Sequence, residues 1–150
     1  MEINKLSIYT IQESDDLFYN IGLLCDKICY SNHQLYLLAN NQDLEILDYK
    51  LWTFSTSAFV PHIIYEKNTH YNDEFVVILS ENESLDSLKI KNNIIMYDVK
   101  VLQSYIDKNI NIADNIILIT KEFEIEGKIS SLIYKELSKF QKENSSWVKI

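Results

Sequence analysis

The segment NIILIT, residues 115–120, places four consecutive aliphatic side chains between polar residues, without alternation of apolar and polar positions. A short run of this kind is typical of a strand that is covered on both faces, as in a parallel sheet. Similar runs occur at residues 6–11, 34–39, 75–80 and 93–99. These five segments predict the strands of a mainly parallel sheet.

Apolar repeats with helical spacing occupy the stretches between these segments. Apolar residues recur at steps of four, three and four from Leu17 to Ile28, which predicts a first helix. Shorter repeats predict a second helix near residues 44–51 and a third near residues 102–106, and a last helix is expected over roughly 124–142. The alternation of strands and helices predicts an α/β sandwich.

Composition favours one globular domain over residues 1–150, because 47% of the residues are hydrophobic and 24% are charged. The two glycines, Gly22 and Gly127, stand alone, so neither a GxGxxG motif nor a Walker-type loop can be written. We therefore expect no nucleotide cofactor. The formal charge is −8 and all 14 basic residues are lysines, which disfavours direct nucleic-acid binding.

The sequence also predicts a cytoplasmic protein that does not cross a membrane. Its start, MEINKLSIYT, lacks the basic flank and the long apolar stretch of a signal peptide. No apolar run approaches the length of a membrane span. The two cysteines, Cys25 and Cys29, fit a reducing compartment.

A metal site is not expected. Cys25, Cys29 and His33 are spaced by four residues, so a helix could aim all three in one direction. A fourth ligand and the short CxxC hairpin that zinc sites favour are missing from this stretch. Cysteines beside a leucine and isoleucine repeat are more often buried thiols.

His62 is the one candidate for catalysis, with Ser55 and Ser57 nearby in the sequence. A serine–histidine pair would make a small hydrolase or transferase, but it needs an orienting acid and an oxyanion hole. The chain has no GxSxG motif that would expose a nucleophile on a tight turn. We assign no catalytic residue and keep an enzyme using His62 as the alternative.

Lysines are regularly spaced in the expected last helix. Lys128, Lys135, Lys139 and Lys142 are separated by seven, four and three residues. On a helix they would fall within a sector of about 60°, with Leu132 on the border of the apolar face. Such a row suits an acidic peptide that ends in an aromatic residue and a free carboxylate. The alternative is an ordinary solvated helix face.

The stretch LWTFSTSAFVPH, residues 51–62, gathers large apolar groups where a helix must end. Pro61 disfavours helical backbone at the residue before it, so the second helix stops earlier. The aromatic side chains of Trp52, Phe54 and Phe59 either cap the core or form a rigid platform for a partner, since aromatics concentrate at interface hot spots.

This motif resembles the chi subunit of bacterial DNA polymerase III. That family has a leucine–tryptophan pair at the end of its second helix, then an aromatic residue and a phenylalanine-x-proline-histidine string. The matching residues here are Leu51, Trp52, Phe54, Phe59, Pro61 and His62. The resemblance is organisational over the whole chain and specific at 51–62. It implies a three-layer Rossmann-like sandwich that binds no nucleotide and acts as a non-catalytic accessory subunit.

The resemblance also implies two partners. One is the psi subunit of the clamp-loader complex, and the other is the acidic C-terminal tail of single-stranded DNA-binding protein. In the family an arginine contributes to the tail site, whereas this chain has Leu132 or Ile133 at that point and no arginine. A generic protein-binding adaptor is the remaining alternative. The residues predicted to contact psi are Trp52, Phe54, Phe59 and Pro61. The residues predicted to contact the tail are Lys128, Leu132, Lys135, Lys139 and Lys142.

Overall fold

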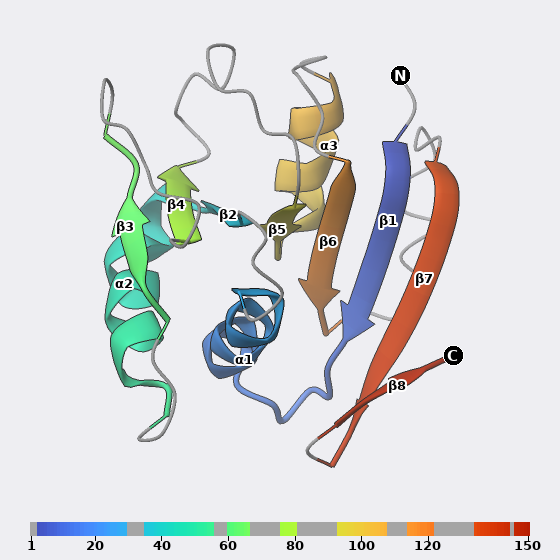
Figure 1. The fold of residues 1–150 in the computed structure, drawn as a ribbon, viewed down its shortest axis with the longest axis horizontal. Helices are drawn as coiled ribbons and strands as arrows, with labels where there is room; N and C mark the ends of the chain where they lie inside the picture. The colour runs from blue at the N-terminus through green and yellow to red at the C-terminus, as the bar shows by residue number, and fades with distance from the viewer. Residues whose placement is uncertain are drawn as a thin grey trace. The chain divides into compact units, whose positions relative to one another are not determined.

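A computed structural model of the protein describes eight stretches of the chain (Figure 1). They are residues 3–29, 35–55, 60–66, 76–80, 93–107, 114–121, 134–144 and 146–150. The chain divides into two compact units, which are considered separately below. One unit is Asp16–Ser84, and the other combines Met1–Asp15 with Leu85–Ile150.

In the described residues of the unit Asp16–Ser84 there are three parallel strands and two α-helices. Strand β4 lies between β3 and β2 and pairs with both in parallel. Every residue of β2 and β4 is buried, as expected for apolar runs without alternation. The elements are α1 (Leu17–Cys29), β2 (Leu35–Ala39), the 3₁₀-helix η1 (Asn41–Asp43), α2 (Leu44–Thr53), β3 (His62–Ile64) and β4 (Val76–Ser80).

The part of the second unit that the structure describes has five strands in the order β5-β6-β1-β7-β8, with one helix. The first four strands pair in parallel, and only β8 runs antiparallel to its neighbour β7. The elements are β1 (Ile3–Thr10), β5 (Asn93–Met96), α3 (Val99–Asp107), β6 (Asn115–Thr120), β7 (Tyr134–Glu143) and β8 (Ser146–Lys149).

These elements confirm the predicted α/β fold with a mainly parallel sheet. Each of the five apolar runs overlaps a strand, and three of the four expected helices form, at α1, α2 and α3. The sequence patterns did not predict β3 or β8, which have only three and four residues. The single domain over residues 1–150 stays a prediction. Within the described stretches, no helix is long and apolar enough to span a membrane.

The helix expected over roughly 124–142 is wrong for its second half. Residues 134–143 form the strand β7, and residues 122–133 lie outside the described stretches. The apolar spacing there fits a helix, but β7 pairs in parallel with β1 and antiparallel with β8. The ladder with β1 extends from Tyr134 to Gln141 and the ladder with β8 from Phe140 to Glu143, and such tertiary pairing overrides local helical spacing.

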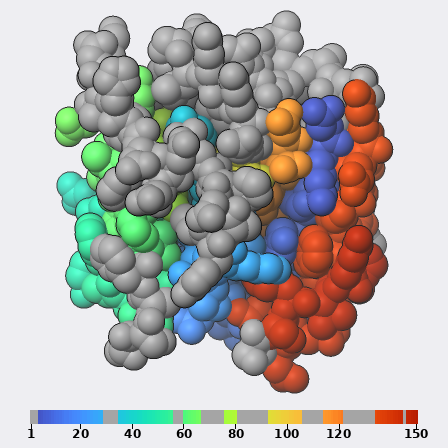
Figure 2. Space-filling model, viewed as in Figure 1, coloured from blue at the N-terminus to red at the C-terminus, as the bar shows by residue number. Residues whose placement is uncertain are grey.

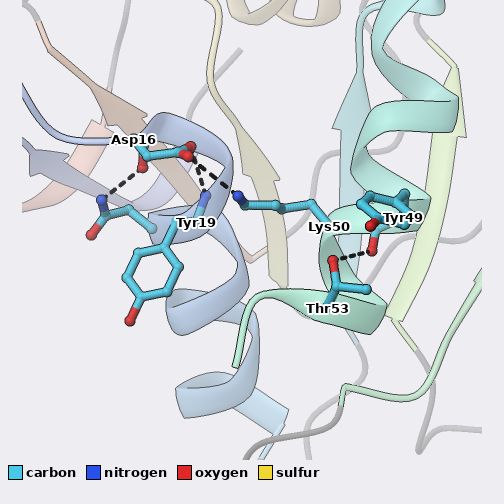
Figure 3. Close-up of polar contacts among 6 residues, drawn as sticks. Asp16, Tyr19, Tyr49, Lys50 and Thr53 are labelled. Carbon is cyan, nitrogen blue, oxygen red and sulfur yellow. Dashed lines mark hydrogen bonds and ion pairs between the residues drawn. The ribbon is translucent and has the colours of Figure 1, made fainter. Parts of the chain in front are cut away.

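Asp16 begins helix α1 and links it to α2. Its Oδ1 accepts a hydrogen bond from the backbone N–H of Tyr19 at 3.1 Å, which is the N-cap contact to the first helical turn (Figure 3). Its Oδ2 lies 3.3 Å from Nζ of Lys50 on α2. The Tyr19 N–H, assisted by Lys50, lowers the pKa of the Asp16 carboxyl below its ordinary value of 3.8.

Asp16→Ala should therefore lower the free energy of unfolding at pH 7 by about 1 kcal/mol, the usual cost of losing an N-cap. The carboxylate stabilises the fold above the ordinary pKa of 3.8, and this contribution disappears as the pH falls through the lower folded-state pKa. Urea unfolding at neutral and at strongly acidic pH measures the difference. Asp16→Asn, which keeps a capping oxygen, is the control and should lose less. A deficit in the alanine variant that is unchanged in strong acid would contradict the assignment.

Candidate partner-binding surface

Helix α2 exposes three large apolar side chains on one face. Ile46, Tyr49 and Trp52 are spaced by three residues and are 50%, 69% and 49% exposed. The opposite face buries Leu47 and Leu51 completely or nearly so. Residues three apart are neighbours on a helix, so the three exposed side chains form one row, here named the α2 stripe. Aligned exposed apolar residues of this size mark a candidate interaction site.

Two polar contacts involve residues next to this row. The Lys50–Asp16 ion pair joins α2 to the start of α1, and Thr53 Oγ1 donates to the backbone oxygen of Tyr49 at 2.9 Å (Figure 3). The Thr53 contact closes the last turn of the helix, directly beside Trp52. The space-filling view shows α2, in blue-green, with side chains at the surface (Figure 2).

Phe54, which follows α2, belongs to the core. Its side chain is only 6% exposed and its ring lies against Gly22 of α1. A Cβ added at Gly22 would come within 2.8–3.1 Å of three ring atoms, so only glycine allows this close approach. Tyr19 adds an edge contact with ring centroids 6.3 Å apart. Phe54 thus fixes the end of α2 against α1 from the inside.

His62 connects the start of β3 to α2. The side chain is fully buried, and Nδ1 lies 2.7 Å from the backbone oxygen of Val60. Nε2 lies 2.9 Å from Oδ1 of Asp48 and 3.1 Å from the backbone oxygen of the same residue. The ring of Trp52 lies 4.6 Å from the His62 ring, at an interplanar angle of 55°. One side of Trp52 therefore rests on a buried histidine.

The residues predicted from the motif have different places in the structure. Trp52 is exposed, Phe54 is buried and Pro61 is half-buried, while Phe59 lies outside the described residues. Sequence reasoning missed Ile46 and Tyr49. Their signal was present in the sequence: both lie at helical spacing from Trp52, outside the buried repeat of the same helix.

The contacts of His62 do not support the hydrolase or transferase alternative. Both ring nitrogens of His62 face oxygen atoms of Val60 and Asp48, so neither is directed at a serine hydroxyl. A general base must be within hydrogen-bond reach of the group that it activates.

The three residues considered as metal ligands are only partly described. Cys25 is completely buried in α1, and the side chain of Cys29 and all of His33 lie outside the described part of the chain.

The β7–β8 hairpin carries the second candidate surface. Lys135 and Lys139 are four residues apart on a strand, so their side chains point to the same side. Val148 and Ile150 share that side, because Val148 is opposite Gln141 in the register and the Ile150 N–H donates to the Lys139 carbonyl at 3.0 Å. Both apolar side chains are exposed. We name Lys135, Lys139, Val148 and Ile150 the hairpin face.

Lys142 lies on the other side of the hairpin and is 7% exposed. Its Nζ is 5.3 Å from the centre of the Trp147 ring, a cation–π contact. Trp147 meets Tyr9 edge-on at 5.0 Å, and Tyr9 stacks on Phe140 at 4.5 Å. Burial raises the pKa of the Tyr9 hydroxyl. Lys142 thus helps to attach the hairpin to β1.

The predicted row of lysines is therefore divided. Lys135 and Lys139 share one face of a strand, whereas Lys142 points to the opposite face. Lys128 and Leu132 lie outside the described residues. The helical sector of about 60° does not apply to the three lysines on β7, because side chains on a strand alternate between its two faces.

Comparison with known proteins identifies the family of this chain. A family model described as DNA polymerase III chi subunit, HolC, matches residues 4–131. The match includes the α2 stripe and the motif at 51–62, and it ends before the β7–β8 hairpin. Searches of curated proteins and of solved structures gave no match. The chain belongs to the DNA polymerase III chi subunit (HolC) family, which is known as a family of non-catalytic accessory subunits.

Proposed function

We propose that this protein links the DNA polymerase III complex to single-stranded DNA-binding protein. In this proposal the α2 stripe binds the psi subunit or an equivalent partner, and the hairpin face holds the acidic C-terminal tail of single-stranded DNA-binding protein. The observation that carries the proposal is the row of Ile46, Tyr49 and Trp52, exposed on a helix inside the matched residues.

The α2 stripe suits a protein partner better than a small molecule. Its members project from the convex surface of a helix, whereas small-molecule sites are concave. Trp52 and Tyr49 are residue types that dominate binding energy at protein interfaces, and Trp52 is backed by the buried His62 ring. A rigid, preplaced aromatic ring loses little conformational entropy when a partner covers it.

The hairpin face has the two features that an acidic peptide ending in an aromatic residue requires. Lys135 and Lys139 supply positive charge for carboxylates, and Val148 and Ile150 supply exposed apolar surface beside it. Lysine contacts a carboxylate as a point charge rather than as a bidentate fork. Binding should therefore be modest in strength and sensitive to salt.

Reversing the charge of both lysines, Lys135→Glu with Lys139→Glu, should weaken binding of a synthetic acidic tail peptide at least tenfold. The reason is that two attractive charges beside the peptide become repulsive. Calorimetric titration at about 50 mM and 200 mM salt measures the effect, and the wild type should bind more weakly at the higher salt.

The control reverses two lysines elsewhere, Lys27→Glu with Lys100→Glu, and gives the same net charge. It should retain most of the tail binding, because α1 and α3 lie outside the hairpin face. Equal loss in both double variants would point to net charge alone. Unchanged binding in the Lys135 and Lys139 variant would remove the hairpin face from the proposal.

A further inference from the structure

We propose that His62 is a positioning residue of the α2 stripe, held as an imidazolium that donates from both ring nitrogens and keeps Trp52 in its exposed place. The consequence for partner binding rests on the function proposed above. The charge state of His62 and its effect on Trp52 do not, because both can be measured on the isolated protein.

The oxygen atoms that surround the His62 ring indicate which protonation state of the ring satisfies its contacts. A neutral imidazole has one N–H and one lone pair. The backbone oxygens of Val60 and Asp48 can only accept, and they lie 2.7 Å from Nδ1 and 3.1 Å from Nε2. Either neutral tautomer would therefore direct a lone pair at an oxygen lone pair. The doubly protonated ring satisfies all three contacts, including the 2.9 Å contact to the Asp48 carboxylate.

The surroundings can support this buried charge. Asp48 on α2 supplies the charged group that faces the ring, and its half-exposed carboxylate forms a direct pair with Nε2. Among the described residues, the group that faces the ring from the loop before β3 is the uncharged Val60 carbonyl, and the residue of β4 paired with His62 is the apolar Val76. A buried charge is tolerated when it is paired and hydrogen-bonded, as it is here.

The His62 ring also contacts the α2 stripe, through Trp52. Asp48 and Trp52 are four residues apart, so they lie on one side of α2, and His62 contacts both. A cationic ring against the tryptophan adds an electrostatic attraction to the packing. Loss of the proton would turn one hydrogen bond into a repulsive contact, loosening the support beneath Trp52. Protonation of His62 would thus control how firmly Trp52 is held in the α2 stripe.

The direct test is the nitrogen NMR spectrum of the histidine rings near pH 7, in uniformly ¹⁵N-labelled wild-type protein. The chain has three histidines, His33, His62 and His70, and His33→Gln and His70→Gln variants identify the His62 signals by elimination. We expect two protonated ring nitrogens with nearly equal shifts. Two widely separated shifts, the pattern of a neutral tautomer, would overturn the proposal.

Fluorescence of Trp52 tests the coupling to the surface. Trp147→Phe leaves Trp52 as the sole tryptophan. Because imidazolium quenches indole emission, Trp52 emission should rise when the pH is raised from about 6 to 9, across the range in which histidine titrates. Asp48→Asn should move this rise to lower pH, since the carboxylate favours the charged ring. Emission that is independent of pH, or a rise unaffected by Asp48→Asn, would show that His62 does not control Trp52.

Binding experiments separate this proposal from the proposed function. With a psi-type partner in hand, Asp48→Asn should weaken binding more at pH 8 than at pH 6, because less of the variant's His62 stays charged at the higher pH. If no such partner binds but the NMR and fluorescence results hold, the proposed function fails and the positioning role stands. If a partner binds with no dependence on His62, the positioning role fails alone.

Discussion

Phe54→Ala is expected to lower the free energy of unfolding by about 3–5 kcal/mol. Phe54 is 6% exposed and its ring fills the space in front of Gly22, with Tyr19 at its edge. Truncation removes the ring from an apolar environment and leaves a cavity between α1 and the end of α2. Glycine at position 22 cannot fill that space, so little collapse is available to reduce the cost.

Chemical unfolding followed by circular dichroism measures this change. Tyr49→Ala is the matched control, because it also deletes an aromatic ring, but one that is 69% exposed on an earlier turn of α2. It should change the free energy of unfolding by about 0.5 kcal/mol or less, as surface substitutions usually do. Similar losses in both variants would mean that Phe54 is not the buried anchor of α2.

Trp52→Ala is expected to weaken binding of the psi subunit, or of the equivalent partner, about 30-fold or more. That factor corresponds to about 2 kcal/mol, the threshold for an interface hot spot. Trp52 is half-exposed, its ring is braced by His62, and it continues the row of Ile46 and Tyr49. Fold stability should change much less than in Phe54→Ala, because no closed cavity forms at an exposed position.

Calorimetric titration of the purified partner, alongside thermal unfolding of each variant, separates binding from folding. Ile150→Ala removes a similarly exposed apolar side chain from the hairpin face and should leave this affinity unchanged. Wild-type affinity in Trp52→Ala would move the partner site away from α2. A variant that unfolds would instead show that Trp52 is part of the core.

The candidate surface was only partly predictable from the sequence. The motif at 51–62 identified the region, yet its aromatic residues have opposite roles, with Trp52 exposed and Phe54 buried. That difference depends on Gly22, a residue some thirty positions earlier that lets α1 approach the Phe54 ring. The contact is non-local, so apolar composition within the motif does not encode it. The same holds for the support that His62 gives to Trp52.

The β7–β8 hairpin shows where prediction from hydrophobic spacing fails. Apolar residues that recur at steps of four, four, four and three from Ile125 to Phe140 are compatible with a helix, and the sequence alone favoured one. The backbone of residues 134–143 instead completes ladders with β1 on one side and β8 on the other. Hydrogen bonds to β1 join residues more than 120 positions apart, which a local window does not register. The lysines consequently divide between two faces instead of sharing one.

The sequence by itself determined the α/β class, the buried parallel strands and the positions of α1, α2 and α3. Each follows from local hydrophobic patterning: unbroken aliphatic runs must be covered on both faces, and apolar stripes must bury one side of a helix. Only the tertiary structure decided that β7 and β8 pair with each other, that Phe54 packs inward and that Ile46, Tyr49 and Trp52 face outward. These outcomes depend on contacts between distant segments, whose packing and hydrogen bonding outweigh local preference.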